Sequence, residues 1–303
     1  MTSEEQNEVQ QVIRAIPALA QINCTVHRLG GLTNRVYAVD NYVLRIPGKG
    51  TEEYIHRVNE VVMAKTAAMA GVSPQVIYAD AKSGIMVTRR VLGVTMSPKR
   101  FKTDAESVVR AGQALAKLHR SSAMFPSRFE LFTVMNDYVN LLVTKDYALP
   151  DGYQGAVNNA EIIRTALAKH PAPLVPSHCD PLCENFLDDG KRMWIVDWEY
   201  AGMNDPMWDL GDLSIEGAFT PQQDAALIHA YFAGAASAAD QGRMVIYKAM
   251  CDLLWALWSL IQHANQNSAE DFAAYAANRF KRCNDLMATT DFALHLKAIS
   301  AQK

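Results

Sequence analysis

The residues with the clearest chemical potential occupy two neighbouring segments, 178–185 (HCDPLCEN) and 194–199 (WIVDWE). In them, Asp180 is followed five residues later by Asn185 and, after an apolar strand, by Asp197. This order lets one carboxylate meet an acceptor hydroxyl while two oxygen donors hold Mg²⁺, as phosphoryl transfer requires. Each of the three alone could be an ordinary loop or turn residue. Together they predict a phosphotransferase.

The amino-terminal part of the chain offers residues for a nucleotide. The backbone of the turn 30–34 (GGLTN) can approach phosphate oxygens closely, although such a turn is most often only a hairpin. Arg45 and Glu60 could form the ion pair that positions phosphates in kinase folds, or could be two solvated surface charges. We expect the ATP site to include the following residues: Gly31, Thr33, Asn34, Arg45, Glu60, Thr88, Arg89 and Val91.

A third group of residues suits a cationic acceptor. Trp255 and Trp258 lie three residues apart, so they share one helical face, and Asp252 lies a turn earlier. Aromatic residues at this spacing are usually part of a core. A quaternary ammonium, however, has no N–H to donate and is held by π faces and a nearby carboxylate. We therefore expect a trimethylammonium alcohol to contact Tyr200, Glu216, Asp252, Trp255, Trp258 and Tyr275.

The elements that must position these groups change in character near residue 90. Strand-like runs predict four strands, at residues 33–39, 42–46, 75–78 and 85–91. One helix is expected from an N-cap at Thr51 to Gly71, with one side formed by Ile55, Val58, Val61 and Val62. Residues 1–90 are therefore predicted to form a small β-rich lobe that binds the nucleotide.

Beyond this region the pattern becomes helical. A capping box from Thr103 to Glu106 predicts a helix that runs to His119, and further helix starts are expected at Thr220 and Ser268. The apolar stretch 250–261 is shorter than the roughly 20 residues that a bilayer requires, so it predicts a buried helix.

Between these helices lies one β-like stretch, 174–198, which folds back at 188–190 and carries the catalytic segments. The junction near residues 87–93 is short enough to act as a hinge. We therefore predict an α+β, bilobal architecture with a cleft between the lobes. In it, residues 94–303 form a mostly helical carboxy-terminal lobe with the catalytic loop and the acceptor pocket.

The composition excludes several classes of protein. Half of the 303 residues are hydrophobic, which excludes disorder, and 29 Lys and Arg against 32 Asp and Glu leave no basic stripe for nucleic acid. The start lacks the features of a secretory signal, so we expect a cytoplasmic protein that binds neither nucleic acid nor membrane. The five cysteines are expected to be reduced thiols, and no second pair of ligands supports a zinc site at His178, Cys179 and Cys183.

These segments resemble the choline/ethanolamine kinase family, within the aminoglycoside phosphotransferase and protein-kinase-like group, and choline kinases above all. The resemblance covers most of the chain. Residues 178–187 (HCDPLCENFL) are similar to the family's catalytic loop, and 195–202 (IVDWEYAG) to its Asp-x-Glu-Tyr motif. The resemblance implies Asp180 as the catalytic base, a Mg²⁺ site that includes Asn185, Asp197 and Glu199, and Tyr200 facing the choline site.

Three further segments strengthen the resemblance. Residues 208–216 (WDLGDLSIE) are similar to the segment that carries an acidic choline contact, here Glu216, and 253–262 and 275–280 look like choline-pocket helices. By the same resemblance, Arg45 stands where typical kinases carry Lys. Cys179 replaces the Arg that receives an activation-loop phosphate in regulated kinases, and Leu182 replaces a Lys on the transferred phosphoryl group. We therefore expect constitutive activity.

Three functions remain open. The first is a choline kinase that uses ATP and Mg²⁺ to make phosphocholine. The second is an ethanolamine kinase or another small-molecule phosphotransferase, such as an aminoglycoside-modifying enzyme, although polycationic aminoglycosides call for a pocket dense in carboxylates. The third is a catalytically dead binding protein, against which the intact Asp180, Asn185 and Asp197 argue. Arg89 and Arg90 stand where an apolar residue is expected against adenine, so the adenine contacts also remain open.

Overall fold

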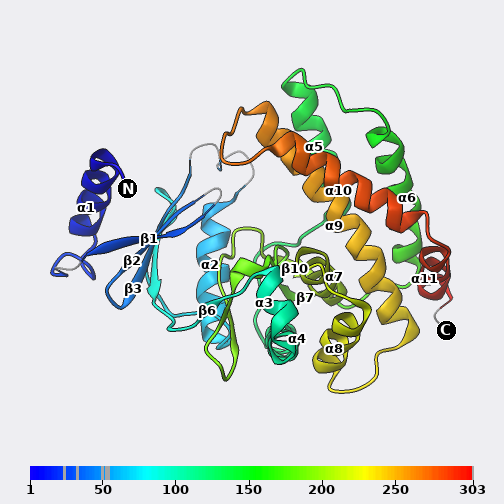
Figure 1. The fold of residues 1–303 in the computed structure, drawn as a ribbon, viewed down its shortest axis with the longest axis horizontal. Helices are drawn as coiled ribbons and strands as arrows, with labels where there is room; N and C mark the ends of the chain where they lie inside the picture. Colours follow the sequence, from blue (N-terminus) through cyan, green and yellow to red (C-terminus); the bar gives the residue numbers. More distant parts are fainter. Residues whose placement is uncertain (23–24, 32–33, 49–50, 52–54, 302–303) are drawn as a thin grey trace.

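The amino-terminal lobe is an antiparallel five-stranded sheet with the order β1-β2-β3-β5-β4 (Figure 1). The computed structural model describes residues 1–22, 25–31, 34–48, 51 and 55–301. The predicted hairpin is present, because Val39 pairs with Tyr42 across the turn at Asp40. The strands are β1 (Val26–Gly30), β2 (Arg35–Val39), β3 (Tyr42–Ile46), β4 (Val76–Asp80) and β5 (Ile85–Arg89).

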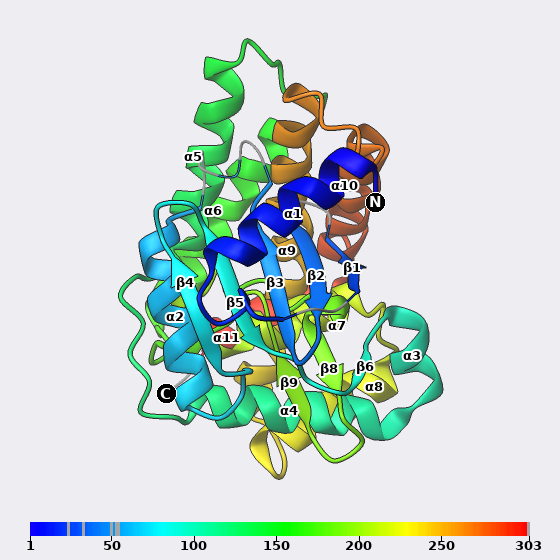
Figure 2. The same cartoon turned by 90° about the vertical axis from the view of Figure 1, so that its left-hand side faces the viewer.

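Two helices cover opposite faces of this sheet. Helix α1 (Ser3–Ala15) crosses the outer face, and α2 (Arg57–Met69) lies on the face toward the carboxy-terminal lobe (Figures 1 and 2). Val9 and Ile13 of α1 are buried in one apolar cluster with Leu44 of the sheet. The sequence analysis did not anticipate α1. Its only two buried positions stand among polar residues, so its apolar stripe is narrow.

The expected start and buried face of α2 were wrong. The helix begins at Arg57, its N-cap is His56 rather than Thr51, and Ile55 precedes it. Val58 and Val62 are exposed, whereas the buried residues are Glu60, Met63, Ala64 and Ala67. A carboxylate occupies the core-facing side of the helix because basic side chains neutralise it there. Apolar periodicity alone therefore selected the wrong face.

Residues 90–93 join the lobes without regular structure, and β6 (Val94–Thr95) then pairs with β8 (Phe186–Asp188) of the catalytic segment. β8 pairs in turn with β9 (Met193–Ile195), and β7 (Val175–Ser177) pairs with β10 (Gly202–Asn204). The remaining elements are helical: α3 (Pro98–Thr103), α4 (Ala105–His119), α5 (Leu131–Thr144), α6 (Tyr153–Lys169), a 3₁₀ turn (Cys183–Asn185), α7 (Pro206–Glu216), α8 (Pro221–Phe232), α9 (Ala238–Ala264), α10 (Phe272–Met287) and α11 (Thr290–Ser300).

The predicted helix starts are partly confirmed. Thr220 caps α8 in a capping box with Gln223. The predicted box at Thr103 is wrong, because Thr103 ends α3 and the side chain of Asp104 accepts the first free backbone N–H groups of α4. The expected start at Ser268 is also wrong, because α10 is capped by Asp271. In both places an Asp side chain takes the role of the cap, one residue after Thr103 and three residues after Ser268.

Helix α9 is the centre of the carboxy-terminal lobe, with α7, α10 and α11 packed against it. By length and composition it could cross a membrane, but 83% of its most apolar 18-residue window is buried inside the protein. The prediction of a buried helix at 250–261 is therefore confirmed within a longer element.

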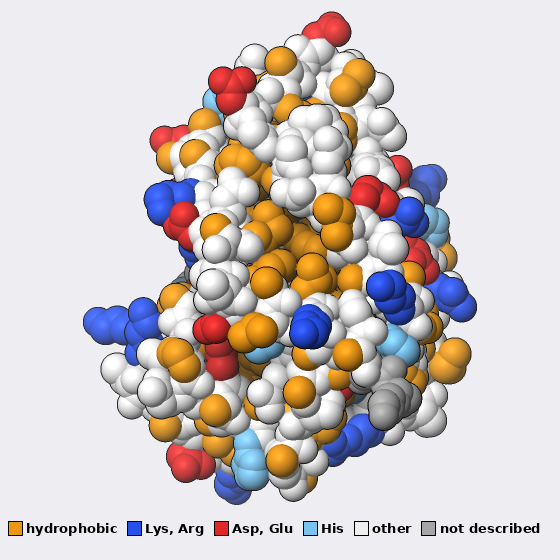
Figure 3. Space-filling view, turned by 90° about the vertical axis from the view of Figure 1, so that its right-hand side faces the viewer, with side chains coloured by type: hydrophobic (Ala, Val, Ile, Leu, Met, Phe, Trp, Pro, Cys, Tyr) orange, Lys and Arg blue, Asp and Glu red, His pale blue; other side chains and the backbone are white. Residues whose placement is uncertain are grey.

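On the face seen in Figure 3, apolar side chains surround a hollow on the side of the molecule where α6 and α11 lie, away from the first sheet.

Candidate active site

A buried carboxylate on α7 holds the catalytic loop in place. Asp209 accepts hydrogen bonds from the backbone N–H of His178 (2.7 Å) and of Cys179 (2.9 Å), and it lies 2.9 Å from Nε2 of His119. Cys179 has a positive φ of 67°, which a non-glycine residue adopts only under such constraint. Burial acts to raise the pKa of Asp209, but His119 and the backbone N–H groups hold it below its ordinary value. The sequence analysis missed both Asp209 and His119.

Asp180 stands at the end of this loop, half-buried. The Nδ2 of Asn185 donates to the backbone oxygen of Asp180 (2.9 Å), so the amide nitrogen fixes the loop and the amide oxygen is the atom that could face a metal ion. Burial first, then the carboxyls of Asp212 and Asp197, raise the pKa of Asp180 well above its ordinary value. A carboxylate with a raised pKa is suited to accept a proton from a hydroxyl group.

Asp197 is the second strained residue of the site, with φ of 68°, and its Oδ1 is buried without a hydrogen-bond partner among the described residues. One oxygen each of Glu60, Asp197 and Glu199 lies within 4.8 Å of the others. Burial, and then Glu199, raise the pKa of Asp197 to about 7, against the opposing effect of Arg45. Clustered carboxylate oxygens with an unsatisfied member fit a hard divalent cation such as Mg²⁺.

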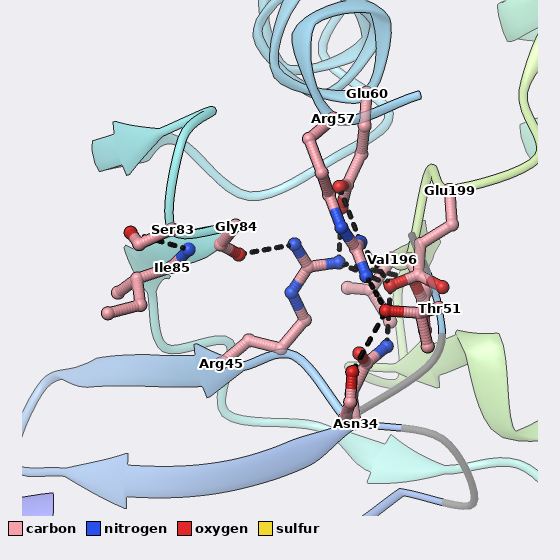
Figure 4. Close-up of polar contacts among 12 residues, drawn as sticks. Asn34, Arg45, Thr51, Arg57, Glu60, Ser83, Gly84, Ile85, Val196 and Glu199 are labelled. Atoms are coloured by element: carbon pink, nitrogen blue, oxygen red, sulfur yellow. Dashed lines mark hydrogen bonds and ion pairs between the residues drawn. The ribbon is translucent and has the colours of Figure 1, made fainter. Parts of the chain in front are cut away.

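The predicted ion pair between Arg45 and Glu60 is present, within a larger network that joins the lobes. Figure 4 shows Arg45, Arg57 and Asn34 of the amino-terminal lobe converging on Glu199 of the other lobe. Their nitrogen atoms lie 2.8, 2.8 and 2.6 Å from Glu199 Oε1. Arg57 also donates to Glu60 Oε2 (2.8 Å). The sequence analysis missed Arg57, although it stands three residues before Glu60 on the same helix face.

Gly31 occupies a position where only glycine fits. Gly31 has φ of 109°, and a Cβ atom there would lie 2.0 Å from the backbone oxygen of Asn34. This close approach brings Asn34 to the cleft, where its side chain is buried against Glu199. Thr33, also expected at the ATP site, lies outside the described residues.

The three residues expected at the hinge occupy different environments. Thr88 lies within the sheet, paired with Val43 and Val76. The guanidinium of Arg89 is exposed and stacks on the ring of Tyr42 at 5.1 Å from its centroid. A cavity of about 350 Å³ adjoins the junction, lined by Pro74, Gln75, Arg89, Arg90, Val91, Leu92, Asp189 and Trp194. The structure thus brings Arg89 and Val91 together and leaves Thr88 apart.

The expected aromatic residues form a connected series. Tyr200 meets Trp255 edge-to-face at 5.2 Å between ring centroids, and Trp255 meets Trp258 at 6.3 Å. Trp258 continues the series to Phe272 at 5.6 Å, a residue that the sequence analysis missed. The face of Tyr275, in contrast, already carries the guanidinium of Arg279, 4.7 Å from the ring centroid.

The two carboxylates expected to meet the cation have internal partners. Asp252 accepts hydrogen bonds from Arg279 and Arg282, and Glu216 forms an ion pair with Arg279. Both acids are thus neutralised by α10 rather than left free for a substrate, contrary to expectation. The reason is tertiary, since Asp252 and Arg279 are 27 residues apart and meet only because α10 packs along α9.

Comparison with known proteins supports this geometry. A model of the phosphotransferase enzyme family matches residues 25–245. The chain is 55% identical to a choline/ethanolamine kinase family protein from Mesorhizobium loti, whose crystal structure superposes with a TM-score of 0.92 over 98% of this chain and 99% of that chain. The chain belongs to the choline/ethanolamine kinase family. As a member, it is an ATP-dependent phosphotransferase with the protein-kinase-like fold.

More distant members of the family include kinases named for either substrate. The choline kinase LicA from Streptococcus pneumoniae is 26% identical, with a TM-score of 0.80 over 94% of this chain and 99% of that chain. Ethanolamine kinase 2 from Mus musculus is 24% identical over 83% of this chain and 73% of its own length. The match to the phosphotransferase model ends before Trp255, Trp258 and α10, so the acceptor pocket lies largely outside it.

The network around Arg45 generates the first prediction. Arg45→Ala leaves Glu60 and Glu199 short of a buried cation, so we expect the free energy of unfolding to fall by about 3 kcal/mol. We also expect kcat/KM for ATP to fall by at least about tenfold, because charge that positions the phosphates is lost. Chemical denaturation and steady-state kinetics would measure these effects. The control is Arg35→Ala, which removes an exposed pair with Glu8 and should change neither the stability nor the kinetics. Normal kinetics in Arg45→Ala would contradict a role of Arg45 in positioning the phosphates.

The pairing of Asp252 generates the second prediction. Asp252→Asn leaves Arg279 with one fewer acidic partner and removes the ion pair of Arg282, so we expect a loss of about 3 kcal/mol in stability. Urea denaturation would measure it. The exposed Asp285, which pairs with Lys281 on α10, provides the control Asp285→Asn. An Asp252→Asn protein as stable as the wild type would mean that these pairs are energetically neutral.

Proposed function

We propose that this kinase transfers the γ-phosphoryl group of ATP to the hydroxyl of choline and releases phosphocholine and ADP. The observation that carries the proposal is the series of rings formed by Tyr200, Trp255 and Trp258, on elements that flank the catalytic loop. A trimethylammonium group offers no N–H, so π faces and diffuse negative charge are what recognise it. The alcohol of the same molecule is then presented to Asp180.

The proposed reaction assigns a role to each acidic group of the cleft. Asp180 accepts or orients the hydroxyl proton as the acceptor oxygen attacks in line. Asn185, Asp197 and Glu199 would hold Mg²⁺, which supplies charge to the phosphate oxygens when bound. Arg45, kept in place by Glu60, adds positive charge where the loop carries Leu182 instead of a lysine. We place the ATP phosphates beside Gly31 and Asn34.

Two further observations support the setting of the reaction. A solved structure of LicA, 26% identical to this chain with a TM-score of 0.78, contains AMP. The four cysteines within the described residues are free thiols, as a reducing cytoplasm would keep them. We therefore propose a cytoplasmic enzyme whose partners are ATP and its alcohol substrate, without nucleic acid or membrane.

Ethanolamine is the second candidate acceptor. Named ethanolamine kinases are among the relatives, and an ammonium with N–H groups could donate hydrogen bonds to a carboxyl group of the cleft. The likeness to aminoglycoside phosphotransferases, at 13 to 15% identity, concerns the fold alone. A panel of choline, ethanolamine and an aminoglycoside, assayed by ADP release with ATP and Mg²⁺, tests the proposal. Choline should give the highest kcat/KM, and a preference for ethanolamine or the aminoglycoside would overturn it.

The rings generate a prediction about specificity. Trp258→Leu and Trp255→Leu keep an apolar wall but remove the attraction of the π face, so we expect choline binding to weaken by about 0.5–2 kcal/mol. That loss corresponds to a rise in KM of about twofold to thirtyfold. Ethanolamine should lose less, because hydrogen bonds contribute more to its binding. Michaelis constants for both alcohols would measure the contrast.

A tryptophan outside the pocket provides the control for these variants. Trp194 on β9 donates to Asp189, so Trp194→Leu should leave both Michaelis constants unchanged. Equal losses for choline and ethanolamine in Trp255→Leu and Trp258→Leu would assign the rings to shape alone.

The raised pKa of Asp197 generates a prediction about Mg²⁺. Without the ion, the protonated form of Asp197 stabilises the fold, and this contribution is lost as pH rises from the ordinary value of 3.8 toward about 7. Mg²⁺ binds the carboxylate, so its thermal stabilisation of the protein should be larger at pH 8 than at pH 6. Melting curves with and without MgCl₂ would measure the difference. Asp197→Asn should remove it, and a pH-independent shift would argue against Asp197 as a ligand.

A further inference from the structure

Helix α7 carries an acidic residue to which neither the sequence motifs nor the geometry described above assigns a role. The side chain of Asp212 has no solvent exposure, and both of its oxygens lack a hydrogen-bond partner among the described residues. A buried carboxyl group without a partner is costly, so its presence requires an explanation.

The charges around Asp212 are not balanced within the protein. Asp209 has His119 and two backbone N–H groups, and Asp252 has Arg282 in addition to Arg279. Arg279 therefore serves Asp252 and Glu216 at once. Among the described residues, Arg279 is also the cation that acts on Asp212. Within the described residues, Asp212 is thus the carboxyl of this group that has no hydrogen-bond partner at either oxygen.

On α7, Asp212 lies about one turn after Asp209, which holds the catalytic loop, and about one turn before Glu216, which pairs with Arg279. Among the charged groups, Asp212 is also the one that most raises the pKa of Asp180. The pKa of Asp212 itself is raised, first by burial and then by the acids Glu216 and Asp209 of the same helix. Two groups act in the opposite direction: Arg279 of α10 and the indole N–H of Trp255 on α9. The Trp255 N–H favours the carboxylate without forming a regular hydrogen bond.

We propose that Asp212 is the counter-charge for the cationic head group of the substrate. The ammonium supplies the positive charge that the protein omits and acts on Asp212 through the pocket wall, whereas Glu216 and Asp252 each already pair with an arginine. This inference rests on the proposed function only in that the substrate is a small alcohol with an ammonium group. It predicts that the pocket selects for charge as well as for shape.

The test compares choline with its neutral isostere, 3,3-dimethylbutan-1-ol, in which carbon replaces the ammonium nitrogen. Asp212→Asn keeps the size of the side chain and removes its charge. We expect the variant to raise KM for choline by about tenfold or more and to change KM for the neutral alcohol by less than about twofold. Its melting temperature should be unchanged or higher, because an amide replaces a buried carboxyl group that lacks a hydrogen-bond partner among the described residues.

A matched control separates this effect from a change in overall charge. Asp224 on α8 is paired with Lys248, so Asp224→Asn removes one acidic charge from the same lobe without touching the pocket and should leave the choline Michaelis constant unchanged. Equal changes for choline and the neutral alcohol in Asp212→Asn, or no change for choline, would overturn the proposal. If Asp212→Asn fails to fold, the wild-type protein alone provides the test. A wild-type KM for choline that is less than about tenfold below the KM for the neutral alcohol would contradict a counter-charge.

Binding of tetramethylammonium, followed by the fluorescence of the pocket tryptophans, distinguishes this inference from the proposed function. In one outcome, the wild type binds tetramethylammonium, Asp212→Asn binds it about tenfold more weakly, and neither protein phosphorylates choline. The counter-charge proposal then stands, but the choline kinase assignment fails. If choline is phosphorylated and the variant binds tetramethylammonium as the wild type does, the assignment stands and the counter-charge fails. No binding to the wild type overturns the counter-charge.

Discussion

The architecture of this kinase depends on how it keeps several carboxyl groups buried in one cleft. Glu60, Asp197 and Glu199 come within 4.8 Å of one another, and Asp180 and Asp212 lie nearby. Such a concentration of negative charge is unstable unless cations or protons accompany it. Arg45 and Arg57 of the amino-terminal lobe form ion pairs within the group of the first three acids. The remaining negative charge is reduced by protonation, which the raised pKa values favour, and, as we propose, is balanced by Mg²⁺ and the substrate.

This requirement also explains how the lobes are joined. Asn34, Arg45 and Arg57 all donate to a single oxygen of Glu199, so the nucleotide turn, the sheet and α2 are tied to the catalytic segment through one side chain. The backbone connection between the lobes is short and lacks regular structure. Met63, Ala64 and Ala67 of α2 also belong to the apolar core of the carboxy-terminal lobe, so charge within the cleft is one part of what sets the relative position of the lobes. That part responds to the ligands that alter this charge.

The carboxy-terminal lobe solves the same problem in two ways. Around the catalytic loop, Asp209 uses backbone N–H groups and His119 as partners, which converts a buried charge into a rigid support for Asp180. Around the acceptor pocket, α10 supplies arginines that neutralise two of the three acids. In the function that we propose, the rings of Tyr200, Trp255 and Trp258 provide the surface for the cationic head group. Rigid support and incomplete neutralisation would both serve a charged substrate there.

The sequence by itself determined the catalytic chemistry and much of the fold. The order of Asp180, Asn185 and Asp197 is local, because one loop and one hairpin place all three, and the resemblance of these segments was confirmed by the family to which the chain belongs. The hairpin of β2 and β3 followed from alternating residues and a short turn. Local spacing also identified the tryptophans of α9, since residues three apart share a helical face.

Only the tertiary structure decided which charges are free. Glu60 appeared to stand on a polar face of α2 yet is buried, because Arg45 and Arg57 reach it there. Asp252 and Glu216 appeared available, but α10 brings Arg279 to both. Asp212 has no distinguishing sequence signal, and its lack of a partner is visible only once α7, α9 and α10 are packed. Partners distant in the chain meet through helix packing, and burial strengthens each charge interaction beyond anything that residue spacing can express.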